Sequence, residues 1–179
     1  MNFPMASAKL QGYDPKQVDA LMARVKSQHD NPDRELISSA VVAIAKFDLV
    51  PGGYQIPAVD EAIAKAADAF EVNELQRELQ VKGKAQAAAD LAALLRLLKQ
   101  VLETDPKSRF ERVSQGYNPR QVNALIKKIE IKRSTLSGPT TFELRTASLG
   151  RSSNGFDRDQ VDEFLGAVGS ALHRQQLLG

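Results

Sequence analysis

Residues 12–22 read GYDPKQVDALM, and the chain repeats this phrase with variations three more times. We name the four occurrences stretch 1 (residues 12–22), stretch 2 (53–63), stretch 3 (116–126) and stretch 4 (155–165). Stretches 2 to 4 read GYQIPAVDEAI, GYNPRQVNALI and GFDRDQVDEFL. All share a glycine, an aromatic residue, four variable positions, a valine, then Asp or Asn before apolar or small residues. Four matches in 179 residues indicate internal duplication.

Each stretch predicts the start of a helix. In stretch 1 we expect Asp14 to be the N-cap residue, with Pro15 at the first helical position. Gln17 lies three residues after Asp14 and would complete a capping box, and Tyr13 and Val18 would form a hydrophobic staple. The equivalent pairs are, for the box, Asn118 with Gln121 and Asp157 with Gln160, and, for the staple, Tyr54 with Val59, Tyr117 with Val122 and Phe156 with Val161.

The recurring positions are the residues that we expect to serve the structure or to contact a partner. They are Gly12, Tyr13, Val18, Asp19, Gly53, Tyr54, Val59, Asp60, Gly116, Tyr117, Val122, Asn123, Gly155, Phe156, Val161 and Asp162. Each glycine is expected to provide a turn with positive φ. For the Asp or Asn after each valine we favour a hydrogen bond to neighbouring backbone or to a cap, and contact with a partner is the alternative.

Apolar residues at i, i+3, i+4 and i+7 predict amphipathic helices and a mainly α, or all-α, fold. The expected helices cover residues 15–29, 33–46 (with a strand as the alternative), 56–81, 85–103, 119–132, 140–149 and stretch 4 through 175. Gly83 is expected to kink or break the long helical region, and Thr140 with Glu143 predicts a further capping box. Loops are expected at 47–53, 134–140 and 150–155.

The spacing of the stretches predicts a second level of organisation. Gly12 and Gly53 are 41 residues apart, and Gly116 and Gly155 are 39 residues apart. We therefore predict one pair of stretches in residues 1–70, a helical linker in 71–105, and a second pair in 106–179. The expected architecture is a duplicated, pseudo-two-fold helical bundle.

The four stretches resemble the DivIVA domain motif of bacterial cell-division and polar-growth scaffolds. The resemblance includes an apolar residue six positions before three of the glycines, namely Phe47, Phe110 and Leu149. Phe3 lies nine residues before Gly12 and is expected to fold back onto the core. The layout is similar to that of small DivIVA-domain repeat proteins, which carry several copies of the motif without the long coiled coil.

The resemblance implies a non-enzymatic protein–protein interaction module or adaptor in bacterial cell division or polar growth. The partners that it implies are other proteins, including the division or cell-envelope machinery, and a second copy of the chain. The implied location is the cytoplasm, at the inner face of the membrane at the septum or pole. Whether the protein touches the membrane surface is left open by the resemblance.

Composition and motifs point away from catalysis. The chain has 42% hydrophobic and 26% charged residues, a net charge of +2 and no cysteine, so neither a disulfide nor a thiolate site can form. His29 and His173 lack a carboxylate or second histidine at ligand spacing and are expected at the surface. We find no signal peptide, P-loop or nucleophile elbow. We therefore expect no catalytic residue, no cofactor and no metal site.

Residues 105–133 contain eight Lys or Arg against three Asp or Glu. The commonest meaning of such an excess is a solvated face, and the sharper hypothesis is contact with an anionic surface. The residues expected on that face, on or just beyond the third helix, are Arg120, Lys127, Lys128, Lys132 and Arg133. This predicts an alternative function, a peripheral membrane-binding protein that docks on anionic lipid. Nucleic acid ranks below both, because no DNA-reading module is evident.

Overall fold

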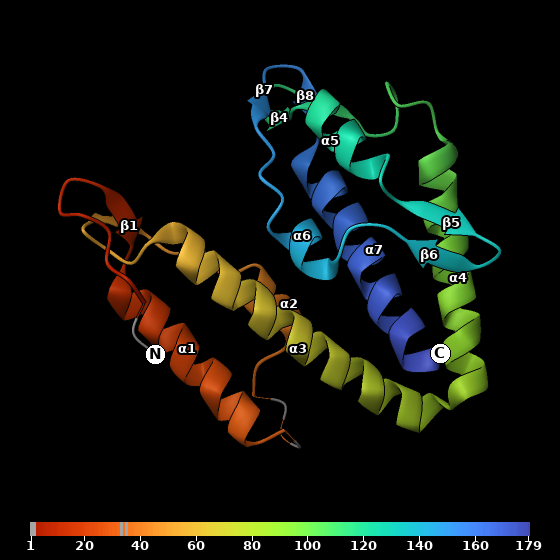
Figure 1. Ribbon diagram of the computed structural model, residues 1–179, viewed down its shortest axis with the longest axis horizontal. Coiled ribbons are helices and arrows are strands. Elements are labelled where there is room, and N and C mark those ends of the chain that lie inside the picture. Colours follow the sequence, from red (N-terminus) through yellow and green to blue (C-terminus); the bar gives the residue numbers. More distant parts are fainter. Residues whose placement is uncertain (1–2, 33, 35) are drawn as a thin grey trace. The chain divides into compact units, whose positions relative to one another are not determined.

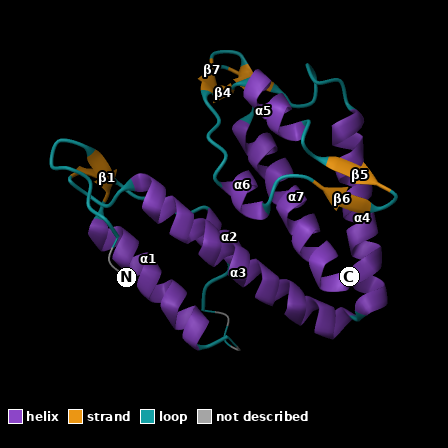
Figure 2. Cartoon of the chain, viewed as in Figure 1, coloured by secondary structure: helices purple, strands orange, loops and turns teal. Residues whose placement is uncertain are grey.

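The computed structural model describes residues 3–32, 34 and 36–179, and it is mainly helical (Figures 1 and 2). Helices account for 58% of the chain, seven of them lie in the described residues, and the sheets are small, which confirms the predicted helical class. The chain forms two compact units, unit 1 (Met1–Glu74) and unit 2 (Leu75–Gly179). The boundary falls inside helix α3 (Ile56–Lys82).

Unit 1 packs α1 (Pro15–Asp30), the short α2 (Ser39–Ala43) and the first part of α3 around one core. Strand β1 (Gln11–Tyr13) pairs antiparallel with β2 (Leu49–Pro51) and places Gly12 opposite Val50. The core residues follow the predicted helical spacing and are Val18, Leu21, Met22 and Val25 of α1, Val42 of α2, and Val59, Ile63, Ala67 and Phe70 of α3.

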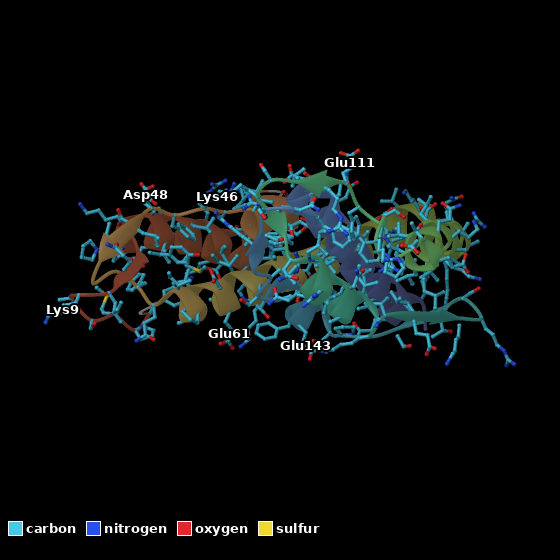
Figure 3. The ribbon with its side chains drawn as sticks, turned by 90° about the horizontal axis from the view of Figure 1, so that it is seen from above. Lys9, Lys46, Asp48, Glu61, Glu111 and Glu143 are labelled. Atoms are coloured by element: carbon cyan, nitrogen blue, oxygen red, sulfur yellow. The ribbon has the colours of Figure 1, made fainter. Side chains whose placement is uncertain are left out.

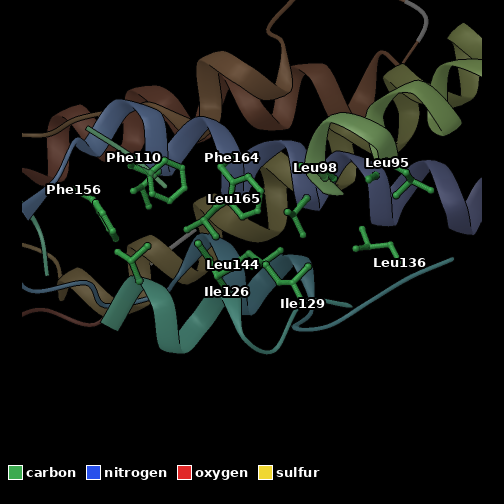
Figure 4. Close-up of a cluster of buried hydrophobic side chains, with 14 of the residues drawn as sticks. Leu95, Leu98, Phe110, Ile126, Ile129, Leu136, Leu144, Phe156, Phe164 and Leu165 are labelled. Atoms are coloured by element: carbon green, nitrogen blue, oxygen red, sulfur yellow. The ribbon is translucent and has the colours of Figure 1, made fainter. Parts of the chain in front are cut away.

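Unit 2 packs α4 (Lys84–Glu103), α5 (Pro119–Ile126) and α6 (Thr141–Arg145) with the C-terminal helix α7 (Arg158–Leu178). A four-stranded antiparallel sheet has the order β3 (Arg112–Val113), β8 (Gly155–Phe156), β4 (Gly116–Tyr117) and β7 (Arg151–Ser152). Its core joins the leucine stripe of α4 to aromatic residues near the sheet, where Phe110 lies beside Phe156 and Phe164 (Figure 4).

The predicted helix over 119–132 is wrong after Ile126. The chain turns there and forms a hairpin of β5 (Glu130–Lys132) and β6 (Thr135–Ser137) (Figure 2). Arg133 and Ser134 form its tip with φ of 47° and 67°. The Gln175 side chain of α7 accepts from the N–H of Leu136 at 2.7 Å and donates to its carbonyl at 3.0 Å. These two hydrogen bonds secure the hairpin, and the expected loop at 134–140 therefore contains a strand.

The predicted helix over 33–46 is also largely wrong, although Asp33 and Glu35 lie outside the described residues. Only Ser39–Ala43 is helical, because a side chain holds the preceding segment as a loop. The Gln28 carboxamide oxygen accepts from the N–H groups of Leu36 and Ile37 at 2.7 and 3.1 Å. Its nitrogen donates to the Arg34 carbonyl at 2.6 Å. A local side-chain network thus satisfies the backbone in place of helical hydrogen bonds.

Of the other predicted helix boundaries, some are confirmed and some are wrong. The break at Gly83 is confirmed, since Gly83 has φ of 81° and separates α3 from α4. The Thr140 capping box is confirmed, but its helix ends at Arg145 instead of 149. The final helix continues to Leu178, and the expected loops at 47–53 and 150–155 contain β2 and β7. None of the helices in the described part of the chain is long and apolar enough to span a bilayer.

Candidate functional site

The four glycine–aromatic stretches meet two by two. In unit 1 the Tyr13 N–H donates to the Tyr54 carbonyl, and the Tyr54 N–H donates to the Tyr13 carbonyl, both at 2.9 Å. In unit 2 Tyr117 is the antiparallel partner of Phe156. In each unit the backbones of two stretches that are distant in the sequence therefore pair at their aromatic residues. We call this pairing the backbone crossing of the unit.

The glycines are required by close approach, and the prediction that they have positive φ is wrong. Among the described glycines only Gly52 and Gly83 have positive φ. A Cβ on Gly12 would lie 2.4 Å from the Tyr54 carbonyl oxygen, and one on Gly116 would lie 2.3 Å from the Phe156 carbonyl oxygen. Both contacts are with backbone, which cannot move aside as a flexible side chain would. The absent side chain therefore allows the two stretches to cross.

The predicted N-caps are confirmed. The Asp14 side chain accepts from the Lys16 N–H at 2.8 Å, and the Asn118 side chain accepts from the Arg120 N–H at 2.9 Å. At the start of α7, Asp157 accepts from the Gln160 N–H at 3.0 Å. These caps satisfy backbone donors that the first helical turn leaves open.

The glutamines expected to close capping boxes bind across the pair instead. Gln17 accepts from the Asp48 N–H at 2.8 Å, and Gln121 accepts from the Gly150 N–H at 2.6 Å. Gln160 accepts from the Glu111 N–H at 3.0 Å. In each case the donor lies five residues before the glycine of the opposite stretch. The box prediction is therefore wrong because a distant backbone group competes successfully for the side chain.

A capping box would also have satisfied the backbone N–H of each N-cap residue. That N–H group donates instead to the segment that the glutamine binds, just before the opposite stretch. The N–H groups of Asp14, Asn118 and Asp157 donate to the carbonyls of Asp48, Gly150 and Glu111 at 2.9, 2.7 and 2.8 Å. Each N-cap is consequently held by the segment that leads into the other stretch. This reciprocal clamp makes the start of one helix depend on its partner.

Buried apolar residues surround each crossing. The four valines Val18, Val59, Val122 and Val161 are 0% exposed. Their contact with the aromatic ring of the same stretch, the predicted staple, stays a prediction. Across each pair, Phe47 packs on Tyr13 and Phe110 on Phe156, with ring centroids 5.2 and 5.3 Å apart.

Phe3 folds back as expected, and its ring centroid lies 5.3 Å from that of Tyr54. The next residue, Pro4, accepts from the Gln55 N–H at 2.9 Å, as Asp48 does from Asp14. Phe3 thus occupies the place that Phe47 takes opposite Tyr13. The three additional residues between Phe3 and Gly12 are accommodated in the lead-in.

The three aspartates that follow a valine bind a tyrosine of the opposite stretch, which corrects for them the favoured explanation of a neighbouring backbone group or cap. The Tyr54 hydroxyl donates to Asp19 at 3.2 Å, and the Tyr117 hydroxyl donates to Asp162 at 3.2 Å. The Tyr13 hydroxyl of stretch 1 likewise donates to the Asp60 carboxylate of stretch 2.

The fourth position shows why Asn replaces Asp there. The aromatic residue of stretch 4 is Phe156, which has no hydroxyl to donate. Asn123 instead accepts from Arg109 at 2.8 Å and donates to the Pro106 carbonyl at 2.9 Å. The one stretch with Phe in place of Tyr is thus paired with the one stretch that has Asn in place of Asp.

Burial and charge shift the pKa values of these pairs. Burial, and then the nearby Asp60 carboxylate, raise the pKa of Tyr13 to about 12. Burial also raises the pKa values of Tyr54 and Tyr117, with Asp19 and Asp162 adding to the shift. For Asp60 and Asp162, burial raises the carboxyl pKa more than the tyrosine hydrogen bond lowers it.

The raised pKa of Asp162 predicts a pH-dependent stability. Because the folded carboxyl holds its proton more tightly, its stabilising contribution is complete below the unfolded pKa, near ~3.9, and is lost as pH rises through the folded pKa. Asp162→Asn removes this titration. We expect the unfolding free energy of wild type minus that of the variant to decrease from pH ~3.5 to ~6. Urea titrations across this range measure the difference, and an increase with pH would contradict the burial argument.

Unit 1 also carries a groove of about 530 Å³ between α1 and the segment from α2 to β2. Its apolar lining includes Ala20, Leu21, Val41, Ala45 and Phe47. Arg24 and Lys46 are exposed cations of the lining with no hydrogen bond or ion pair to any described residue. Lys46 and Asp48 extend outward from unit 1 in Figure 3. Sequence reasoning missed this groove, because it depends on where α2 ends.

The structure distributes the five predicted basic residues over three elements instead of one helical face. Arg120 is on α5, Lys127 and Lys128 follow its end, and Lys132 and Arg133 are in the β5–β6 hairpin. All five are exposed, and Lys132 forms an ion pair with Glu130 at 2.8 Å.

His29 is exposed, as expected, but His173 corrects the expectation of a surface position, since it is only 5% exposed. His173 lies four residues, or about one helical turn, after buried Gly169, so the two share a buried face of α7.

No protein-family model matches the chain, and comparison with curated proteins and with solved structures also gave no match.

Proposed function

We propose that the protein is a non-enzymatic protein–protein interaction module or adaptor, and that unit 1 receives a partner in its apolar groove. The observation that carries the proposal is an exposed apolar surface where unit 2 has polar residues. Val41 and Ile44 are 44% and 73% exposed in and beside the groove. Exposed apolar surface rimmed by polar groups is typical of interaction sites.

The proposal includes a duplicated, pseudo-two-fold architecture of DivIVA-type stretches, one pair in each unit. The reciprocal clamps described above support it, and so do α2 and α6. Counting back 15 residues from Gly53 and from Gly155 gives Ser38 and Thr140, the N-caps of these two helices. Their C-cap residues have φ and ψ of −98° and 6° in one case and −97° and 8° in the other.

This correspondence provides an internal comparison for the groove. Buried Val42 corresponds to buried Leu144, so the inward face is apolar in both units. On the outward face, Val41 corresponds to Glu143 and Ile44 to Thr146. Folding therefore does not require apolar residues at the outward positions. Partner binding is a reason for unit 1 to carry them.

Charge indicates the chemistry of the partner. Arg24 and Lys46 flank the apolar lining, whereas the Asp48 carboxylate accepts from the Gln17 side chain at 2.7 Å. A peptide or protein surface with an apolar side chain beside acidic residues would complement this groove. The setting that we propose, bacterial division or polar growth at the inner membrane face, rests on the DivIVA resemblance alone.

The double substitution Val41→Glu with Ile44→Thr tests the groove, because it installs the residues of unit 2 at equivalent sites. Peptides selected from a random library against wild type should carry an apolar residue flanked by acidic ones. We expect fluorescence anisotropy to show a loss of affinity of roughly tenfold or more in the double variant. Folding should be retained, since exposed substitutions usually change stability by less than about 0.5 kcal/mol.

Leu97→Glu is the control, because Leu97 is an exposed apolar residue on α4 outside the groove. It should leave peptide affinity unchanged. Peptides that bind the double variant as well as wild type would contradict the groove as the site. A second copy of the chain is the other possible occupant of the groove, and light scattering over a dilution series tests for it. Dimers that form with wild type but not with the double variant would identify the second copy as the occupant.

Anionic-lipid docking is the second candidate function, and the exposure of Arg120, Lys127, Lys128, Lys132 and Arg133 favours it. Exposed basic residues near an anionic membrane contribute about 1 kcal/mol each. Co-sedimentation with anionic vesicles should then decrease with salt. Absence from the pellet at low salt would contradict this candidate.

A further inference from the structure

A hollow of about 490 Å³ opens beside the start of α5 in unit 2, and it is independent of the groove in unit 1. Its lining includes the cations Lys107, Arg112 and Arg120, together with Asn118, Ser152 and Asn154. None of the residues that line it is acidic. Two acidic residues, Asp105 and Glu111, are each next to a lining residue in the sequence, but neither lines the hollow, and Asp105 accepts from the Lys107 N–H at 2.7 Å.

Arg112 is held in place by groups on two sides of the hollow. It donates to the carbonyls of Lys107 and Asn154, both at 3.0 Å, and its guanidinium lies 4.3 Å from the centre of the Phe156 ring. These bonds use two of its five N–H donors. A guanidinium held in this way loses less conformational freedom when a ligand binds.

The other two cations are available. The Lys107 ammonium and the Arg120 guanidinium form no ion pair or hydrogen bond with any residue that the structure describes. Three cations around one concavity give a local positive potential that would favour an oxyanion. Arginine donors match phosphate geometry, and a phosphate monoester carries about −1.5 to −2 charges at pH 7.

Unit 1 lacks this chemistry at equivalent positions. Glu111 and Pro4 are equivalent, because the carbonyl of each accepts from the backbone N–H at the start of the opposite helix. The residue after Glu111 is Arg112 and the residue after Pro4 is Met5, so Met5 is the counterpart of the fixed arginine. Asn118 corresponds to Asp14, and Ser152 to Val50. Arg120 has a basic counterpart, Lys16. The stretches can therefore pair without a cationic hollow, and pairing does not explain its composition.

We propose that this hollow binds the phosphate group of a ligand that is free in solution. Lys107 and Arg120 contribute charge-assisted hydrogen bonds, and Arg112 provides a fixed guanidinium between them. Asn118, Ser152 and Asn154 add uncharged hydrogen-bond donors around the anion.

The test is an amide NMR titration of the full chain with inorganic phosphate and with pyrophosphate, at constant ionic strength adjusted with chloride. We expect saturable shifts at residues 106–123 and 152–154. Lys107→Glu combined with Arg120→Glu should weaken binding roughly tenfold or more, because each cation supplies a charge-assisted hydrogen bond. Arg112→Met should also weaken it, and it should stay folded because unit 1 accommodates methionine there.

Lys16→Glu is the matched control, since Lys16 follows an N-cap and a proline in stretch 1, as Arg120 does in stretch 3. It should bind phosphate as wild type does. Shifts that chloride reproduces, or shifts spread over all basic residues, would overturn the proposal. So would binding only to vesicles containing phosphatidic acid, because that outcome assigns the cations to lipid docking.

Discussion

Gly116→Ala is expected to lower the free energy of unfolding of unit 2 by at least about 3 kcal/mol. The added Cβ would lie 2.3 Å from the Phe156 carbonyl oxygen and 2.5 Å from the Gly155 carbonyl carbon. Because both neighbours are backbone atoms, the two stretches must separate. Separation would stretch the β4–β8 pairing and the clamp on the N-cap of α5. Urea unfolding followed by circular dichroism measures the loss.

Gly166→Ala is the matched control for this prediction. Gly166 is in the interior of α7, and an added Cβ would meet nothing within 4 Å. Alanine in place of a glycine inside a helix should stabilise it by about 0.5–1 kcal/mol. The two substitutions therefore have opposite expected signs. If Gly116→Ala were also neutral or stabilising, the close-approach explanation for the glycines would be wrong.

Val122→Asp is expected to destabilise unit 2 by about 4 kcal/mol or more, because it buries a carboxylate without a partner. Val122 is 0% exposed and belongs to the core of unit 2. The cost should decrease at acidic pH, since a neutral carboxyl is less costly to bury than an ionised one. Thermal and urea unfolding at two pH values measure both effects.

Val81→Asp is the control, because it makes the same substitution at an exposed valine. Val81 lies near the end of α3 and is 87% exposed. An acidic residue near a helix C-terminus should cost only about 0.3–1 kcal/mol. If Val122→Asp cost no more than Val81→Asp, the valines of the four stretches would not be core residues. They would then be available to partners.

The candidate sites depended on the sequence to different extents. Arg120 was predicted as an anion-contact residue and does line the hollow, but Lys107 and Arg112 were missed because they lie outside the helix, in the segment between α4 and α5. Lys127 and Lys128 do not line it, because they follow the C-terminal end of α5, whereas the hollow lies at its start. The groove in unit 1 was missed for a similar reason, since Gln28 prevents the long helix expected over 33–46.

Local chemistry in the sequence determined the helical class, the N-caps at Asp14, Asn118 and Asp157, the break at Gly83 and the apolar faces with their valines. These features depend on groups within about one helical turn of each other. Three features were decided only by the tertiary structure. The side chains of Gln17, Gln121 and Gln160 bind a distant backbone N–H instead of their own N-cap. The glycines allow the backbone crossing, and the tyrosines bind carboxylates of the opposite stretch. The physical reason is competition, because each of these groups can satisfy its hydrogen bond or fill its space locally or across the pair. Folding brings the distant partner within reach and decides between them.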